Sequence, residues 1–349
     1  MTGTPSANIV FSLPIGGFTF AVLTLFLHVR SPRDTEPLSR KIVRLDPLGT
    51  LLFLPGIFCF LLALQWGGVV YPWNSGRVIA LFTVAGVLVI AFTAVQIWRQ
   101  EDATVPPRII RQRSILSGAI YMTCIGGALV SLLYTLALWF QDAKGTSAVQ
   151  SGIDTIPLVL SLVVGAILSG AIVTNTGYYV PFMFLCSVLA SVGAGLMITF
   201  QRETGQPAWI GYQVLVGFGI GTGMQQATLA AQTVLQQKDV PIGVSMMFFA
   251  QSLGGAVFVC IGQSLFTNYL STNLSSVPGI NVAALLSSGA TNVSSSVPAD
   301  VLAPVLDIYN AGLRQAFIVT LAVSCLSIVP ALGMEWKSTK GKDTPGPAK

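Results

Sequence analysis

The sequence contains unusually little charge. Only 9% of its 349 residues are charged, whereas 53% are hydrophobic and the mean hydropathy is +0.74. Soluble globular domains have about 25% charged residues, so this composition cannot cover a surface that faces water. The lack of charge excludes a soluble fold and predicts an all-α polytopic membrane protein.

Side chains that carry catalysis or bind metals are scarce as well. His28 is the only histidine in the sequence, and no Asp or Glu falls in the middle of an apolar run. We therefore expect no enzymatic activity, no metal site and no cofactor. The five cysteines lie in separate apolar runs, where cysteine packs as a small hydrophobic side chain, so disulfides are not expected. The net charge is +5, but no basic stripe with interleaved aromatic residues indicates a nucleic-acid partner.

Long apolar runs are what the sequence has in abundance. Crossing a bilayer core of about 30 Å takes about 20 helical residues. Nine runs meet this criterion, at roughly 9–29, 48–66, 78–98, 115–140, 153–174, 178–200, 209–235, 243–266 and 315–334. A stretch rich in Ser, Asn and Ala separates the last two runs, and it is the only long loop that the pattern predicts.

The distribution of Lys and Arg predicts the orientation in the membrane. Of the 18 basic residues, 14 follow the first, third and seventh runs or lie in the tail, and 4 lie in the loops of the other side. By the positive-inside rule, the loops 30–47 and 99–114 and the tail 337–349 are cytoplasmic, and the loop 267–314 is extracytoplasmic.

The extracytoplasmic loop carries two glycosylation sequons. They begin at Asn273 and Asn292, and both are candidate sites in a glycoprotein. The alternative is a chance match, because this loop is rich in Ser and Asn. Both explanations remain open.

Small residues recur at helical spacing inside the spans. A nucleotide-binding glycine fingerprint would need a preceding strand, which an apolar helix does not supply. In a helix the glycines of the seventh run instead form two interleaved small-xxx-small pairs, which let neighbouring helices approach closely. The glycines to which we assign helix packing are Gly217, Gly219, Gly221, Gly223, Gly254 and Gly255.

Three glutamines in the seventh and eighth runs are the candidates for a substrate path. These are Gln225, Gln226 and Gln251. A buried amide costs free energy in hydrocarbon unless it finds a partner or water. They either form interhelical hydrogen bonds without a ligand role or line a polar cavity.

Several motifs resemble those of fungal fourteen-helix drug:proton antiporters of the major facilitator superfamily. The similarity extends over about residues 9–336. LPIGG at 13–17 resembles the start of the sixth helix of these proteins, and LDPLG at 45–49 resembles the entry to their seventh helix. GFGIG with MQQ at 217–226 and DVPIG at 239–243 resemble their twelfth helix and the loop after it. FAQSLGG at 249–255 and GQ at 262–263 resemble their thirteenth helix.

This resemblance covers helices six to fourteen only and implies a partial major facilitator fold. The first five helices, with most of the proton-coupling machinery, have no counterpart in the sequence, so we expect a truncated gene model or a shortened product. The implied organisation is the last helix of the N-terminal bundle at 1–29, a cytoplasmic loop at 30–47, two central linker helices at 48–98, a cytoplasmic loop at 99–114, a C-terminal six-helix bundle at 115–336 that includes the extracytoplasmic loop 267–314, and a cytoplasmic tail at 337–349.

The resemblance implies a transporter. We expect a multidrug-resistance type of efflux pump in the plasma membrane, or alternatively the vacuolar membrane, that exports a drug, toxin or secondary metabolite by antiport. Its expected partners are a small-molecule substrate, membrane lipid and protons as the coupling ion, and no proton-carrying residue can be named. The alternative hypothesis is a truncated membrane fragment that does not transport and has at most an interaction role.

Overall fold

The computed structural model describes residues 6–26, 46–68, 70–100, 103–275, 277, 297 and 301–341. The chain divides into two compact units, Met1–Leu45 and Asp46–Lys349, and each is described by itself. Most of the predicted loop 30–47, the candidate Asn292 and the end of the tail lie outside the described residues.

The first unit contributes one described helix, α1 (Ser6–Phe26). It carries Pro14 inside the helix, and its apolar part is Gly16–Leu25. Phe18 and Phe20 are exposed on it. Each end of this helix lies three residues before the corresponding end of the predicted span 9–29.

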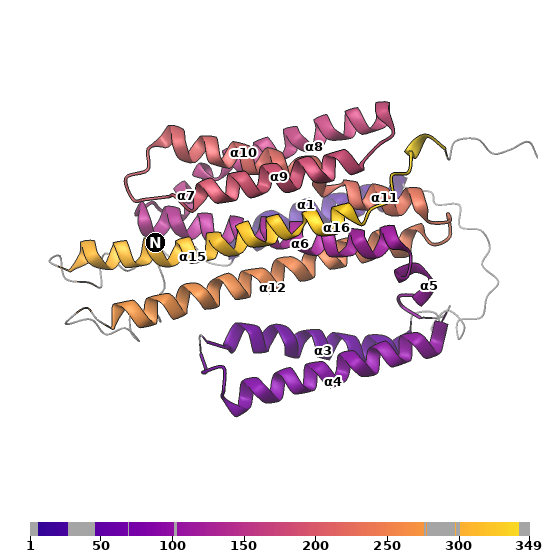
Figure 1. The fold of residues 1–349 in the computed structure, drawn as a ribbon, viewed down its shortest axis with the longest axis horizontal. Coiled ribbons are helices and arrows are strands. Elements are labelled where there is room, and N and C mark those ends of the chain that lie inside the picture. The colour runs from indigo at the N-terminus through magenta and orange to yellow at the C-terminus, as the bar shows by residue number, and fades with distance from the viewer. Residues whose placement is uncertain are drawn as a thin grey trace, which may run out of the picture. The chain divides into compact units, whose positions relative to one another are not determined.

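The second unit begins with a helical hairpin formed by α3 (Pro47–Trp66) and α4 (Gly76–Arg99). α3 starts with Pro at its first position, where the missing N–H costs nothing. The two helices pack along their length and form the lowest pair in Figure 1. The tilted rings of Phe53 and Phe92 are in contact, with centroids 4.7 Å apart, so the two helices pack together through these side chains.

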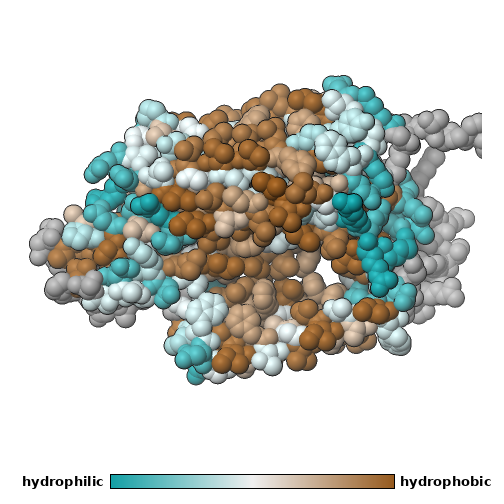
Figure 2. All heavy atoms as spheres, viewed as in Figure 1, coloured by the Kyte–Doolittle hydropathy of each residue, from teal (hydrophilic) through white to brown (hydrophobic). Residues whose placement is uncertain are grey.

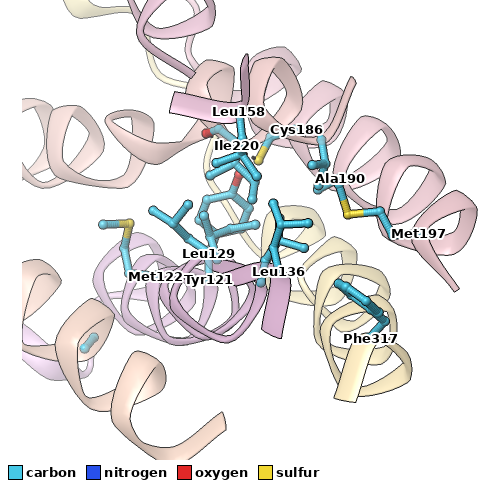
Figure 3. Packing of buried hydrophobic residues seen from close by; sticks show 14 of the residues in the cluster. Tyr121, Met122, Leu129, Leu136, Leu158, Cys186, Ala190, Met197, Ile220 and Phe317 are labelled. Carbon is cyan, nitrogen blue, oxygen red and sulfur yellow. Dashed lines mark hydrogen bonds between the residues drawn. The ribbon is translucent and has the colours of Figure 1, made fainter. Parts of the chain in front are cut away.

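The remaining helices form a bundle around α6 (Figure 1). α6 packs against α12, α15 and α11, while α10 packs against α8 and α9. The core of the bundle is apolar and closely packed, with Tyr121 and Leu136 of α6, Ile220 of α10 and Phe317 of α15 fully buried (Figure 3). The elements are α5 (Pro107–Ile110), α6 (Arg113–Leu138), a π-helix (Trp139–Ala143), α7 (Ala148–Asp154), α8 (Ile156–Thr176), α9 (Val180–Met197), α10 (Gln206–Met224), α11 (Gln226–Val234), α12 (Val240–Leu274), α15 (Leu302–Leu326), α16 (Ile328–Leu332) and a 3₁₀ turn (Thr339–Gly341).

The prediction of an all-α membrane protein is confirmed. Within the described part of the chain, seven helical segments have the length and apolar composition needed to cross a bilayer. The predicted span 209–235 differs, because it consists of α10 and α11 with a break at Gln225. The helix after it also differs, since α12 begins at Val240 and continues to Leu274.

The polar loop between the last two spans is shorter than the predicted 267–314. α12 runs eight residues past the predicted end of its span, and α15 starts at Leu302, thirteen residues before the predicted start. The 35 residues of α12 make a helix of about 52 Å, longer than a bilayer core of about 30 Å. Hydropathy detects only the part of a helix that is apolar enough for lipid, so it misses ends that continue into water.

Candidate functional site

Four of the five glycines of α10 lie at its contacts with α8, α9 and α6. A Cβ added at Gly217 or Gly221 would overlap backbone oxygens of α8, those of Leu158 and Leu162. A Cβ added at Gly219 would lie 2.7 Å from the Cβ of Leu189 on α9, and one at Gly223 would collide with Cys186 of α9 and Tyr121 of α6. α10 is therefore held between α8 and α9 at distances that only glycine allows.

Gly254 and Gly255 lie where α12 crosses α6. A Cβ at Gly254 would overlap the backbone oxygen of Thr123, and one at Gly255 would lie 2.8 Å from a methyl group of Val130. From the other side of the crossing, Gly126 of α6 lies against the backbone of Gln251. Both helices therefore contribute glycine to this contact.

The three glutamines have different surroundings. Gln225 is exposed at the break between α10 and α11, and Gln251 is half-buried at the crossing of α6 and α12. Gln226 is buried, and its amide nitrogen donates to the backbone oxygen of Thr222 at 3.0 Å and to Ser169 of α8 at 3.5 Å. None of the three lines the cavity of about 530 Å³ beside α6, α7 and α8 or the cavity of about 770 Å³ between the α3–α4 hairpin and α12.

The π-helix that follows α6 carries aromatic residues and a buried carboxyl group that the sequence pattern did not reveal. Asp142 lies in the π-helix, is 4% exposed, and neither of its carboxylate oxygens has a hydrogen-bond partner in the described structure. Trp139 stacks on Phe200 at 4.4 Å and donates from its indole N–H to Asn310 of α15 at 3.0 Å. Single-turn π-helices are often found at functional sites, but the signal is invisible to hydropathy, which placed Asp142 just past the end of a span.

An ion pair connects α5 to the start of α12. Arg108 donates from two guanidinium nitrogens to the two carboxylate oxygens of Asp239, at 2.8 and 3.1 Å. The hydrogen bond from Arg108 holds the pKa of Asp239 below its usual value, with the positive charges of Arg108 and Lys238 adding to the effect against the opposing influence of burial. Such bidentate pairs fix geometry as well as charge.

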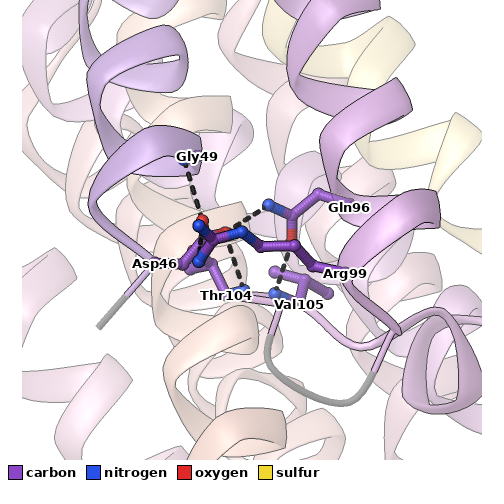
Figure 4. Close-up of polar contacts among 6 residues, drawn as sticks. All are labelled: Asp46, Gly49, Gln96, Arg99, Thr104 and Val105. Carbon is purple, nitrogen blue, oxygen red and sulfur yellow. Dashed lines mark hydrogen bonds and ion pairs between the residues drawn. The ribbon is translucent and has the colours of Figure 1, made fainter. Parts of the chain in front are cut away.

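The buried carboxylate of Asp46 joins the start of α3 to the end of α4 (Figure 4). Asp46 has a left-handed backbone conformation (φ 46°) and caps α3 by accepting from the backbone N–H of Gly49 at 2.9 Å. Its other oxygen accepts from Gln96 of α4 at 2.7 Å and from the hydroxyl of Thr104 at 3.0 Å, and Arg99 lies 3.4 Å away. Burial raises the pKa of Asp46, but the hydrogen bonds from Gly49, Gln96 and Thr104 outweigh it and leave the pKa below its usual value.

Of the two glycosylation candidates, only Asn273 falls in the described structure. It lies in the last turn of α12, is half-buried, and donates to the backbone oxygen of Tyr269 at 2.8 Å. Its glycosylation remains a prediction. Among the described residues, no group of three or more His, Cys, Asp or Glu side chains is arranged to hold a metal ion.

Comparison with known proteins identifies the chain's relatives. Residues 25–335 match the model of the fungal trichothecene efflux pump family (TRI12). The chain belongs to this family. It is 48% identical over 332 residues to the rubrofusarin-specific efflux pump aurT of Gibberella zeae, an alignment that covers 95% of this chain and 61% of that pump.

Further relatives agree with this assignment. The chain is 47% identical over 334 residues to the MFS-type efflux pump MFS1 of Trichophyton rubrum, with 95% of this chain and 62% of the relative covered. It is 44% identical over 334 residues to the MFS acetylaranotin efflux transporter ataA of Aspergillus terreus, with 95% and 74% covered. The resemblance to major facilitator efflux pumps is thereby confirmed, and the family is one of transporters rather than enzymes. The chain spans about three fifths of the length of the first two relatives.

Proposed function

We propose that this protein is part of an efflux transporter that exports a small organic compound across the plasma membrane in exchange for protons. The match of residues 25–335 to the efflux pump family carries this proposal. The relatives named above are a rubrofusarin-specific pump and an acetylaranotin transporter, so we take a secondary metabolite of this kind as the substrate class. Substrate sites in this architecture form between two halves that move against each other.

The three glutamines are proposed to lie along the substrate path. Gln225 and Gln251 support this best, since Gln225 is exposed and Gln251 is half-buried. Gln226 has the weaker case because its amide nitrogen already bonds to Ser169 and Thr222. Its amide oxygen, however, is buried with no partner among the described residues, and such an atom gains free energy when a donor reaches it.

Asp142 is the proposed proton-binding group. A buried carboxylate without a hydrogen bond or counter-ion costs several kcal/mol, so a proton on this carboxyl group removes a large penalty. The titratable groups that face it are the phenols of Tyr134 on α6 and Tyr309 on α15, which interact with it electrostatically. The nearby ammonium group of Lys144 donates to the backbone oxygen of Thr204 at 2.7 Å.

Efflux measured in a yeast strain without its own exporters tests the proposal. The 349-residue chain, and the same chain joined to the segment of the aurT pump that the alignment leaves unmatched, would be loaded with rubrofusarin or acetylaranotin. Proton-dependent efflux by either chain supports transport. Gln225→Ala or Gln251→Ala should then reduce efflux at matched protein level, and Asp142→Asn should remove its dependence on external pH. Absence of efflux from both chains, with normal expression, would favour the fragment that does not transport.

Export requires a defined orientation, which remains a prediction from the 14 to 4 distribution of basic residues. Lys238→Cys and Ser147→Cys place a reactive thiol at opposite ends of the bundle. A membrane-impermeant thiol reagent should label Ser147→Cys on intact cells and Lys238→Cys only after permeabilisation. The reverse pattern would contradict the orientation and the direction of transport.

A further inference from the structure

A cavity of about 770 Å³ lies between the α3–α4 hairpin and the first third of α12. Figure 2 shows the surface hollowed between the hairpin, at the bottom of the view, and the helices above it, with hydrophobic residues on both sides. The loop 104–107 and the end of α5 close the cavity at one end. The volume is within the range of cavities that bind small ligands.

The cavity walls are mostly aromatic and aliphatic. Phe53 of α3 is the centre of the wall, with ring centroids 4.7 Å from Phe92 of α4 and 5.2 Å from Phe249 of α12. Ile242 and Met246 continue the apolar wall along α12. These side chains form a slot between two helices whose outer faces are themselves apolar.

Three polar residues of the cavity, Gln96, Thr104 and Arg111, belong to the end that the loop 104–107 and α5 close. The other two, Thr93 and Ser245, lie on the walls that α4 and α12 form. Of the arginines around this end, Arg99 and Arg108 form ion pairs with Asp46 and Asp239. Arg111 is exposed and has no carboxylate partner in the part of the chain that the structure describes.

The ligand that fits this arrangement has an anionic head and a long apolar tail. Guanidinium groups bind phosphate oxygens through charge-assisted hydrogen bonds, and basic pockets between transmembrane helices bind anionic lipid head groups. Leu51 and Ile90 on the hairpin are 70% and 71% exposed, so the hairpin presents apolar surface that bilayer lipid can cover. We propose that the cavity binds an anionic phospholipid, with the phosphate at Arg111 and an acyl chain along the apolar wall that Phe53, Ile242 and Met246 form.

Native mass spectrometry of the purified 349-residue chain tests this proposal. The protein would be equilibrated in detergent with dioleoyl phosphatidylglycerol or dioleoyl phosphatidylcholine, and the bound fraction of each lipid would be titrated. Arg111→Gln removes the proposed phosphate ligand, and Lys238→Gln is its control, because it removes the same charge at the same end from an exposed residue that does not line the cavity. Ser245→Trp fills the cavity from α12, and Ser252→Trp is its control on the same helix outside the cavity.

We expect phosphatidylglycerol to bind at least tenfold more tightly than phosphatidylcholine. Arg111→Gln should weaken phosphatidylglycerol binding about tenfold, as expected for loss of a charge-assisted contact, while Lys238→Gln should change it less than twofold. Ser245→Trp should abolish retention of either lipid, and Ser252→Trp should not. Inorganic phosphate in excess should not displace the lipid, because the apolar wall holds the tail.

Three results would overturn the proposal. Equal weakening by Arg111→Gln and Lys238→Gln would mean that the lipid responds to the total positive charge at this end of the protein and not to a contact with Arg111. Unchanged lipid binding in a folded Ser245→Trp variant would exclude the cavity, and Thr93→Trp, from the opposite wall, gives the same test if Ser245→Trp does not fold. Binding of rubrofusarin in place of phosphatidylglycerol, weakened by Ser245→Trp, would assign the cavity to the exported compound instead.

Discussion

The α3–α4 hairpin and the helical bundle are both apolar and both helical, but they are held together in different ways. In the most apolar window of α6, 72% of residues are buried, against 17% for α3 and 11% for α4. The bundle has glycines that bring one backbone against another, whereas the hairpin contacts α12 through a pair of phenylalanine rings and a hydrogen bond from Ser264. Segments of similar hydropathy therefore pack in two different ways. Close backbone contact at glycines fixes the position of the bundle helices, whereas the hairpin, in the part of the chain that the structure describes, has no such contact with α12.

The difference follows from what drives association in lipid. Burying an apolar side chain against a helix gains little when the alternative is an equally apolar lipid tail. Close backbone contact and hydrogen bonds supply the stability instead. The bundle has close backbone contacts at Gly221 and Gly254. The hairpin has hydrogen bonds at Asp46 and at Ser264, whose hydroxyl donates to the backbone oxygen of Gly67 at 3.2 Å.

The largest effect is expected from adding a side chain at a glycine crossing of the bundle. Gly221→Leu and Gly254→Leu each place a branched side chain where only backbone now fits, so the helices must separate. Overpacking costs about 1–3 kcal/mol and occasionally more, and a clash with backbone, which cannot move aside as a side chain can, belongs at the upper end. Thermal unfolding of the detergent-solubilised protein should show a large loss of Tm for both variants.

Matched glycines give the control for this prediction. Gly86 of α4 and Gly170 of α8 have open space where a side chain would be added. Gly86→Leu and Gly170→Leu should therefore change Tm only by their effect on the helix itself, which is small and favourable since Gly is a poor helix former. If all four variants unfold alike, the distinction between crossing and open glycines is wrong.

A smaller and more local effect is expected from removing the carboxylate that joins the hairpin. Asp46→Ala leaves buried donors at Gly49 and Gln96 without an acceptor, which costs about 2 kcal/mol. Hydrogen–deuterium exchange should increase in α3 and α4 and not in α6. Asp46→Asn should restore part of the protection, because Asn also accepts hydrogen bonds and tolerates the left-handed conformation. Equal loss of protection in α6 would show that hairpin and bundle unfold together.

Acid should weaken the same hairpin without substitution. The pKa values of Asp46 and Asp239 are both lowered in the folded protein, so their stabilising contribution is complete above the unfolded value of about 3.9 and is lost as pH falls through the lower folded values. Exchange rates corrected for intrinsic pH dependence should rise below about pH 4 in α3 and α5 before they rise in α10. The effect is smaller than that of Asp46→Ala, because a protonated carboxyl group still accepts hydrogen bonds. Asp46→Asn should flatten the acid response in α3 alone.

The sequence predicted most of the helices, since an apolar run is a local pattern, and the assignment of the glycines to helix packing is a prediction that their close contacts support. Apolar length marks a membrane helix wherever it occurs, and glycines four residues apart share a helix face whatever they contact. The glycine spacing therefore predicted two packing faces on α10, but it could not predict that α8 and α9 are the helices in contact with them. The break at Gln225 was missed because hydropathy does not change there.

The polar contacts could not be predicted, because their partners lie far apart along the chain. Asp46 reaches Gln96 and Thr104, which are 50 and 58 residues away, and Arg108 reaches Asp239 across 131 residues. Asp142 was missed for a related reason. Its side chain becomes buried only when the bundle folds, and nothing in its own neighbourhood in the sequence indicates this burial.

The smallest expected effect concerns the far end of the hairpin. Ser264→Ala removes the hydrogen bond from α12 to Gly67, in the turn between α3 and α4. Interhelical hydrogen bonds in membranes contribute about 0.6 kcal/mol on average, so Tm should hardly change, while exchange of the amides in the turn 67–75 should increase about threefold. Ser252→Ala is the control, because its hydroxyl donates to Phe248 within the same helix at 3.0 Å and its loss should leave the turn unchanged. A rise in exchange along all of α3 in Ser264→Ala would mean that this single bond stabilises the whole helix and not only the turn.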